Sequence, residues 1–398
     1  MLYFDHAATS ASRPSQVVQA VADFLSLNGA SPGRGGYSRS VDSGRICFRC
    51  RRKLAGLMGL RGSPGRLAFM MNATHALNTA LFGLLQEDDV VVVSPFDHNA
   101  VLRPVHYLSR ARGVQIRVME GDAQGAVDLQ GARGLMDGAR VVVVNAVSNV
   151  LGTRLPLEEL AGMAHEAGAL VLVDAAQSAG HLTDRPGELG ADLVAMTGHK
   201  GLLGPQGTGA LWLREGVEIP PLLSGGTGGD SALREMPHTM PDHLEAGTPN
   251  APGIAGLLAG LEFLEETGVE RLHTRISELK LRLHGGLSAI AGVTVLSPPD
   301  PAGVGVVTMV SDRTAPSALA AKLDREFGIM TRAGLHCAPE AHRLLGTSET
   351  GALRFSLGWD TTAEGVDTVV DAVEQLVSRD AASTSGVSHT KSEVGRAS

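Results

Sequence analysis

A lysine at the end of a short apolar segment is the first residue of this chain whose setting suggests chemistry. Leu193 to Met196 form an apolar run that stops at a glycine-containing polar turn with Thr197, His199 and Lys200. Such a run is typical of a buried strand that carries polar side chains at its carboxyl end. Burial lowers the pKa of a lysine, and the neutral amine can then act as the nucleophile that a Schiff base requires. Taken alone, the pattern fits a surface-loop lysine equally well.

A carboxylate ends the preceding predicted strand. The apolar run from Ala169 to Val173 is followed by Asp174 and, three residues later, by Gln177. A buried carboxylate needs a cationic partner. Pyridoxal 5'-phosphate (PLP) uses both groups: a lysine for its aldehyde, and an acid that keeps its ring nitrogen protonated so that the ring can accept electrons. Asp174 and Lys200 on one rim of a sheet therefore point to a PLP site.

Other polar residues also follow predicted strands. Each could have a functional role or a purely structural one. Thr74 and His75 open a predicted helix whose free N–H groups could bind a phosphate, although a threonine there is often only an N-cap. His98 could stack on a cofactor ring and move protons. Asn149 could bind a substrate carboxylate or the ring oxygen, or it could brace its own turn.

The predicted smaller domain adds a thiol and two cationic side chains. Cys337 lies in a loop with Arg332 and His336, and nearby positive charge lowers the pKa of a thiol toward the reactive thiolate. The alternative is a buried structural cysteine, the commoner fate of an isolated cysteine. Arg354 stands inside an apolar predicted strand, where a bidentate substrate carboxylate would be a good partner.

Alternating strands and helices must position these residues. The alternation begins at Arg66 and favours a mainly parallel sheet, so the expected fold class is α/β. Helices should sandwich a sheet of the seven-stranded type in the large domain, and the smaller domain should be α+β. The expected segments are 1–14, packed with the small domain, 15–255 as the large domain, 256–378 as the small domain, and 379–398 as a disordered tail.

Composition limits the function classes. The 398 residues are 43% hydrophobic and 19% charged, with 50 glycines, which suits a glycine-rich α/β enzyme. Because 34 basic residues face 42 acidic ones, the net charge is −8 and offers no footprint for nucleic acid or a membrane surface. No apolar run reaches membrane-spanning length, and the N-terminus lacks signal-peptide features. Three cysteines cannot form a disulfide framework, so a cytoplasmic location is expected.

Cys47 and Cys50 lie one turn apart in a predicted helix. This CxxC could suggest zinc or redox chemistry, but zinc needs two more ligands and no second CxxC or CxxH occurs. A redox CxxC usually starts a helix after a strand, whereas this one is mid-helix. We therefore expect two ordinary helix cysteines and no metal site.

Taken together, the motifs resemble those of the cysteine desulfurase and selenocysteine lyase family within the class V aminotransferases, which are fold type I PLP-dependent enzymes. The resemblance covers nearly the whole chain, from residue 2 to about 375. The motifs are Tyr3-Phe-Asp-His-Ala-Ala-Thr-Ser, Pro32-Gly-Arg-Gly, Asn72-Ala-Thr-His-Ala-Leu-Asn78, Asp97-His-Asn, Ser148-Asn-Val-Leu-Gly, Val173-Asp-Ala-Ala-Gln, Thr197-Gly-His-Lys-Gly, Glu245-Ala-Gly-Thr-Pro-Asn and Arg332-Ala-Gly-Leu-His-Cys-Ala-Pro.

The resemblance implies how PLP would be held. Lys200 would form the Schiff base, and Asp174 would partner the pyridine nitrogen. Gln177 would donate to the ring oxygen, and His98 would stack on the ring. The remaining implied cofactor contacts are Thr74, His75, Asn149, Thr197, His199 and, from the other subunit of a homodimer with a shared active site, Thr248.

The resemblance also implies a substrate and a reaction. Asn149, Arg332 and Arg354 would bind L-cysteine, and Cys337 would take up its sulfur as a persulfide while L-alanine leaves. An acceptor protein would then receive the sulfur, for example in iron–sulfur cluster assembly. The alternatives are a selenocysteine lyase, another class V enzyme such as an aminotransferase or epimerase, and, less favoured, a non-catalytic PLP-binding protein.

Three places depart from the family pattern. Asp97 stands where many relatives carry Glu, and His6 replaces a common Asn or Ser. Trp359-Asp-Thr-Thr replaces a more usual Phe-Asn-Thr. These departures bear on substrate preference and leave the expected PLP chemistry intact.

Overall fold

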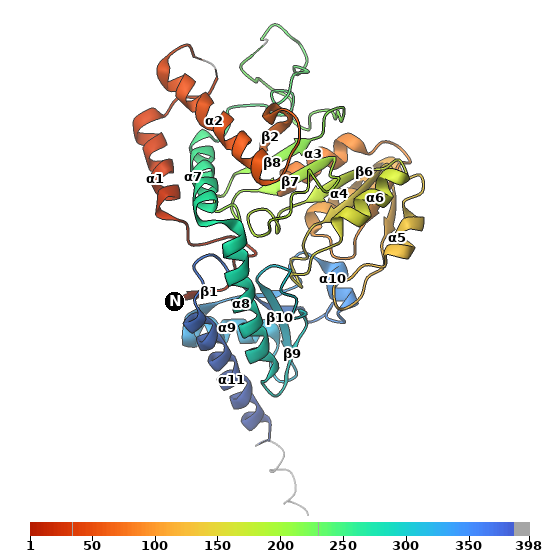
Figure 1. Ribbon diagram of the computed structural model, residues 1–398. Coiled ribbons are helices and arrows are strands. Elements are labelled where there is room, and N and C mark those ends of the chain that lie inside the picture. Colours follow the sequence, from red (N-terminus) through yellow and green to blue (C-terminus); the bar gives the residue numbers. More distant parts are fainter. Residues whose placement is uncertain (34, 230, 386–398) are drawn as a thin grey trace, which may run out of the picture.

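The large domain is built on a seven-stranded sheet with the strand order β2–β8–β7–β6–β5–β3–β4. Figure 1 labels β2, β8, β7 and β6 among these strands. Strand β8 runs antiparallel to β2 and β7, and the other neighbours pair in parallel. The predicted α/β class and mainly parallel sheet are therefore confirmed. The strands are β2 (Leu67–Met70), β3 (Val90–Val93), β4 (Gln115–Val118), β5 (Val141–Asn145), β6 (Leu170–Asp174), β7 (Leu193–Thr197) and β8 (Gly209–Leu213).

Helices cover both faces of this sheet, which explains why its central strands are continuous apolar runs. Along β3, Val90 and Val92 enter one core cluster, while Val91 and Val93 enter the cluster that includes α3 and α4, as the two-residue period of a strand requires. The helices are α1 (Ser15–Asp23) with the π-helical turn η1 (Phe24–Asn28), α2 (Ser38–Leu57), the 3-10 turn η2 (Pro64–Arg66), α3 (Ala73–Leu84), α4 (Asn99–Arg112), α5 (Leu129–Leu135), α6 (Leu157–Glu166) and α7 (Ala251–Thr267).

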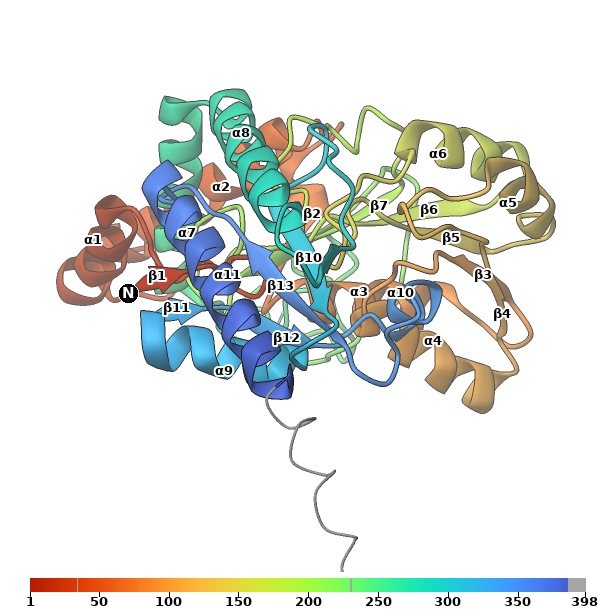
Figure 2. The ribbon, with the colours of Figure 1, turned by 90° about the horizontal axis from the view of Figure 1, so that it is seen from below.

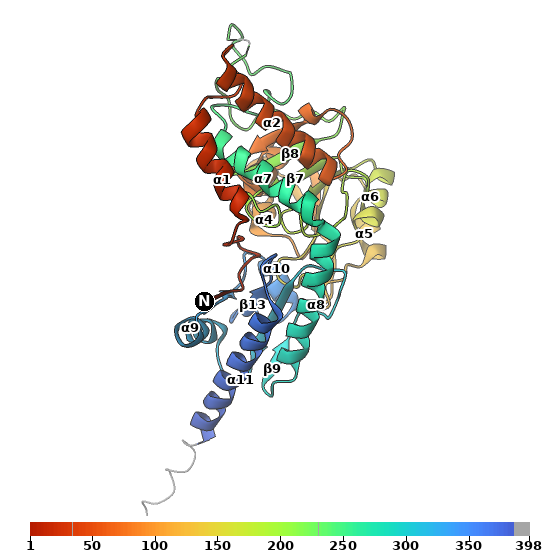
Figure 3. The same cartoon turned by 60° about the vertical axis from the view of Figure 1, so that its left-hand side comes forward.

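The smaller domain has a four-stranded antiparallel sheet, β12–β13–β10–β9, flanked by helices (Figure 2). Helix α7 packs on α1 and α2, and α8 continues from it into the small domain (Figure 3). The elements are α8 (Val269–Ser288), β9 (Val293–Val295), β10 (Val306–Ser311), α9 (Pro316–Phe327), β11 (Ile329–Met330), β12 (Arg332–Gly334), α10 (Pro339–Leu344), β13 (Ala352–Ser356) and α11 (Ala363–Ser385).

The N-terminal strand and the last described helix both pack with this smaller domain. Strand β1 (Leu2–Tyr3) pairs in parallel with β11, and so ties the N-terminal segment to it. Helix α11 continues to Ser385, so residues 379–385 are helical rather than part of the expected tail. The computed structural model describes residues 1–33, 35–229 and 231–385, so the loop residue Arg34 and tail residues 386–398 lie outside it. None of the described helices is both long and apolar enough to cross a bilayer.

Candidate active site

The carboxyl ends of β6 and β7 bring the predicted lysine and carboxylate to one rim. Asp174 is the last residue of β6, and the sheet register pairs it with Ala195 of β7, two residues before that strand ends. Lys200 follows in the next turn. Gly198 makes this turn possible, because a Cβ at that position would lie 2.1 Å from the Oγ1 of Thr208.

A cavity of about 240 Å³ opens at this rim. It gathers residues from both domains and from the N-terminal segment, which contributes Ala7 and Ala8. Most of the predicted site residues line it, namely Thr74, His98, Asn149, Asp174, Gln177, Thr197, His199, Lys200, Arg332 and Arg354.

The lysine and the carboxylate influence each other electrostatically. Burial lowers the pKa of Lys200 to about 8, although the negative charge of Asp174 opposes this shift. Burial raises the pKa of Asp174, while the N–H of Ala176, which donates to its Oδ1 at 2.9 Å, and the lysine both work against the rise. An amine with a pKa of about 8 is neutral often enough near neutral pH to act as a nucleophile or a base.

Hydroxyl and N–H groups gather at the start of α3. Thr74 lies in the first turn of this helix, after the N-cap Asn72. Thr197 contributes a buried Oγ1 that has no hydrogen-bond partner among the described residues. The Nδ1 of His199 lies 3.1 Å from the Oγ1 of Thr9, which leaves the Nε2 edge of its ring without a described hydrogen bond. A helix N-terminus with these neighbours is suited to bind a phosphate.

Two predicted cofactor residues lie elsewhere. His75 and Thr248 line a neighbouring cavity of about 260 Å³, together with apolar residues such as Met71 and Leu223. The Nδ1 of His75 accepts the backbone N–H of Met71 at 3.3 Å. Thr248 is exposed, so neither side chain completes the lysine site of its own chain.

His98 caps helix α4 from the edge of the main cavity. Its Nδ1 accepts the N–H of Ala100 at 3.0 Å, so the neutral ring carries its hydrogen on Nε2. Burial and the nearby positive charge of Lys200 lower the pKa of His98 to about 4. The ring is therefore neutral at physiological pH and can stack on an aromatic ligand.

Two guanidinium groups face the cavity from the smaller domain. The Nη1 of Arg354 donates to the backbone oxygen of Asn149 at 3.1 Å, and its Nη2 donates to Asp5 at 2.7 Å. The Nε of Arg354 is buried and has no partner among the described residues. Arg332 and Arg354 together with Asp5 leave one net positive charge, which matches a single carboxylate.

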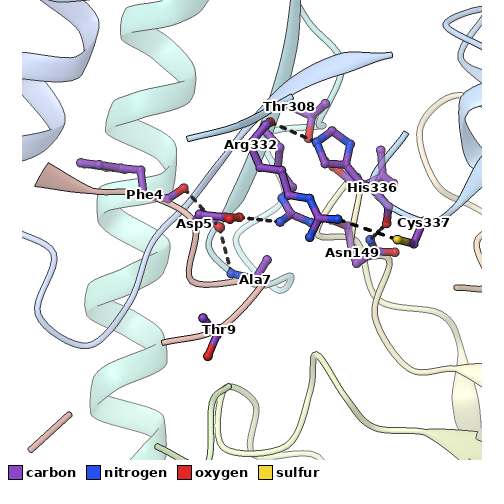
Figure 4. Close-up of polar contacts among 12 residues, drawn as sticks. Phe4, Asp5, Ala7, Thr9, Asn149, Thr308, Arg332, His336 and Cys337 are labelled. Atoms are coloured by element: carbon purple, nitrogen blue, oxygen red, sulfur yellow. Dashed lines mark hydrogen bonds and ion pairs between the residues drawn. The ribbon is translucent and has the colours of Figure 1, made fainter. Parts of the chain in front are cut away.

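Cys337 lies at the edge of this group (Figure 4). Its sulfur is 3.8 Å from the Nη2 of Arg332, and its backbone oxygen accepts the N–H of Asn99 at 2.7 Å. The side chain is partly buried. Arg332 and His336 of the same loop line the cavity, so the cysteine loop forms part of the cavity wall.

The aminotransferase class-V family matches residues 2–369 of this chain. The chain belongs to that family. A probable cysteine desulfurase of Methanothermobacter thermautotrophicus is 35% identical, with 94% of each chain covered. The apo structure of the cysteine desulfurase of Thermococcus onnurineus NA1 has a TM-score of 0.89, 34% identity and 95% of each chain covered. The cysteine desulfurase CsdA (S-sulfonic acid) of Escherichia coli has a TM-score of 0.84, 28% identity, and coverage of 95% of this chain and 94% of that one.

Class V aminotransferases are PLP-dependent, and the cavity fits that cofactor. Lys200 and Asp174 can serve the aldehyde and the ring nitrogen, and His98 can serve the ring face. The unpartnered hydroxyl of Thr197 and the start of α3 suit the phosphate. The cavity residues therefore suit PLP, and Thr248, a phosphate contact implied only by the resemblance, lines the neighbouring cavity instead.

Sequence reasoning missed some contributors to this class V site. His336 lines the cavity beside the cysteine, and Asp5 pairs with Arg354. The family motif at Tyr3 contained Asp5, but no local pattern linked the aspartate to an arginine so distant in the chain. Two departures from the family pattern are in contact, since the Nε2 of His6 lies 3.4 Å from an Asp360 oxygen.

The remaining cysteines lie away from the cavity. Cys47 and Cys50 are buried in α2, and burial raises the pKa of both thiols, that of Cys47 to about 11. Within the described ranges no cluster of His, Cys, Asp and Glu could hold a metal ion. Burial therefore favours the protonated form of both thiols.

Proposed function

We propose that this protein is a PLP-dependent cysteine desulfurase. It would convert L-cysteine to L-alanine and pass the sulfur to an acceptor through a persulfide on Cys337. The observation that carries the proposal is the position of this cysteine, whose sulfur lies 3.8 Å from Arg332, an arginine that lines the same cavity as a lysine and an aspartate suited to PLP. The near full-length similarity to proteins named cysteine desulfurase supports it.

Residues of this chain would hold PLP at both poles of its ring. Lys200 would bind the aldehyde carbon through its Nζ, and Asp174 would keep a proton on the ring nitrogen. Gln177, whose Nε2 donates to the Ala7 oxygen at 3.0 Å, has a second N–H for the ring oxygen. Bound PLP supplies an electron sink for the electron pair left when a substrate proton departs.

The substrate would be held and cleaved by side chains from both domains. Arg354 and Asn149, with Arg332, would orient the carboxylate, and Lys200 would remove the α-proton. The Cys337 thiolate would attack the substrate sulfur, so that a sulfur–sulfur bond forms while the carbon–sulfur bond breaks. Lys200 and His98 would return protons to the three-carbon fragment, which leaves as L-alanine.

A second copy of the chain would complete the site. Met71 and Leu223 are 58% and 50% exposed, and both line the cavity that contains Thr248. Burial of these apolar side chains by a second copy would favour a homodimer, in which Thr248 contacts the phosphate of the partner's site. A sulfur-acceptor protein, for example in iron–sulfur cluster assembly, would then collect the persulfide sulfur in the reducing cytoplasm.

The test is a single turnover of the PLP-loaded protein with L-cysteine, and in parallel with L-selenocysteine. We expect one L-alanine for each persulfide formed. After the persulfide is alkylated, mass spectrometry should locate the alkylated persulfide at Cys337. The buried thiols of Cys47 and Cys50 serve as internal controls and should stay unlabelled. Alanine release without a persulfide on Cys337, or activity with the selenium substrate alone, would overturn the proposal.

A further inference from the structure

Three buried side chains form a hydrogen-bonded chain behind the cysteine loop (residues 332–338). The Nδ1 of His336 lies 3.2 Å from the Nε2 of His342, and the Nδ1 of His342 lies 2.8 Å from the Oγ1 of Thr347. The Nε2 of His336 lies 3.1 Å from the backbone oxygen of Arg332. His336, His342 and Thr347 are only 3%, 0% and 7% exposed.

With both imidazole rings neutral, the direction of each of these hydrogen bonds follows from the one acceptor that cannot donate, the backbone oxygen of Arg332. A carbonyl oxygen can only accept, so the Nε2 of His336 carries a hydrogen and donates to Arg332. The Nδ1 of His336 then accepts from the Nε2–H of His342, whose Nδ1 accepts from the hydroxyl of Thr347. Burial keeps both rings neutral, since it lowers the pKa of His336 to about 3 and that of His342 to about 4.

The cysteine loop, which contains His336, has a strained backbone. His336 and Cys337 have φ values of 49° and 58°, in the left-handed region that disfavours residues with a Cβ. Consecutive residues persist there only when several contacts impose the conformation. The Nδ2 of Asn149 donates to the His336 oxygen at 2.7 Å, and the N–H of Asn99 donates to the Cys337 oxygen at 2.7 Å. These bonds fix the backbone, and the hydrogen bond from His342 fixes the ring of His336.

We propose that His342 is a positioning residue for sulfur transfer. By donating to His336, it holds the loop in the left-handed conformation that keeps the sulfur of Cys337 beside Arg332. This inference rests on the proposed role of Cys337 as the sulfur carrier. His342 and Thr347 do not line the cavity, so they act on the reaction only through His336.

A matched pair of variants separates this role from general packing. His342→Gln places an amide N–H near the former Nε2 and can still donate to His336. His342→Asn is one methylene shorter, so it can meet Thr347 but not His336. His284→Asn is the control, because the Nε2 of His284 lies 3.1 Å from the Ser297 oxygen in the same domain, away from the loop.

The experiment measures single-turnover persulfide formation on Cys337 in the PLP-loaded protein. We expect His342→Asn to slow it about tenfold, the effect of one lost buried hydrogen bond, while His342→Gln and His284→Asn stay within about twofold of wild type. Binding of L-alanine, followed by cofactor absorbance, should be unchanged in all four proteins. A wild-type rate in His342→Asn, or an equal loss in His342→Gln, would overturn the inference.

A second measurement does not depend on the cofactor or on turnover. Hydrogen exchange of the cofactor-free protein should be faster in His342→Asn at the amides of Asn99 and Ala338, which donate to the Cys337 and Leu335 oxygens. If wild type forms no persulfide, the proposed function fails, and exchange at these amides still decides whether His342 holds the loop. Unchanged exchange in His342→Asn would count against that role.

Discussion

Two regions hold the reactive groups in opposite ways: the rim of the large sheet that carries Asp174, Thr197 and Lys200 (the rim), and the cysteine loop (residues 332–338). Asp174 and Thr197 are the last residues of strands in a sheet buried on both faces, and the ladder between β6 and β7 sets their separation. Cys337 lies between β12 and α10 on a left-handed backbone, and its position depends on hydrogen bonds from α4 and from Asn149. A cofactor pole needs a fixed frame, whereas a thiol that collects and delivers sulfur, as proposed for Cys337, would need a loop that can move between the two steps.

This difference implies that the two regions are energetically separable. Of loop residues 332–338, only Ala338 belongs to the core cluster that holds the rim, and the backbone around Cys337 is held by hydrogen bonds from Asn99 and Asn149. Changes at the rim should therefore disable both cofactor binding and sulfur transfer. Changes at the loop should disable sulfur transfer alone.

The largest effect is expected at the rim. Lys200→Ala would remove both the proposed cofactor attachment and the proposed base, so turnover of L-cysteine should fall about 10³-fold or more. The visible absorbance of the bound cofactor should also be lost. Lys280→Ala is a matched control, because Lys280 is a buried lysine whose Nζ donates to the Asp300 oxygen at 2.8 Å in the small domain. Retained absorbance in Lys200→Ala would mean that another residue binds PLP.

The next largest effect is expected at the loop. Cys337→Ser should lower sulfur transfer about 10²-fold or more, because a hydroxyl is a far weaker nucleophile toward sulfur. The affinities for PLP and for L-alanine should stay at wild-type values, as measured by absorbance titration. If PLP affinity fell together with sulfur transfer, the rim and the loop would be coupled, and the comparison would not hold.

The two regions also differ in how far the sequence could predict them. The sheet and its rim follow from local signals, since each apolar run is short and ends in a polar turn. Asp174, His98 and Lys200 could therefore be placed on one rim from the pattern of residues alone. The pattern also suggested PLP roles for Lys200 and Asp174 and a stacking role for His98, and the family resemblance then assigned those roles specifically.

The loop region depended on contacts that no local pattern encodes. The pair between Asp5 and Arg354 joins residues 349 positions apart, and the contact from His336 to His342 needs a helix folded back beneath its own loop. Thr248 could be assigned to a cofactor only through the resemblance. The start of the tail was misplaced because low apolar content after residue 379 suggested disorder, whereas α11 continues to Ser385.

A pH effect of about tenfold would sharpen the account of the rim. Burial lowers the pKa of Lys200 to about 8 in the cofactor-free protein. Since only the neutral amine reacts with an aldehyde, the rate of PLP binding should rise as pH increases and should level off above about pH 8. Stopped-flow absorbance on adding PLP gives this rate. A rate that continues to rise toward pH 10.5, the ordinary lysine pKa, would show that the amine is not perturbed.

The smallest expected effect tests the charge balance where the two regions meet. Asp5→Asn keeps an oxygen for the Nη2 of Arg354, 2.7 Å away, but removes the negative charge beside the arginine. A bound carboxylate should then be attracted more strongly, and L-alanine should bind about fivefold more tightly in absorbance titrations. Asp42→Asn, at an exposed ion pair with Arg45, should leave the affinity unchanged. Weaker binding in Asp5→Asn would instead show that the aspartate is needed to orient Arg354. The position of Arg354 would then depend on a contact from the N-terminal segment, just as the position of Cys337 depends on contacts from other segments.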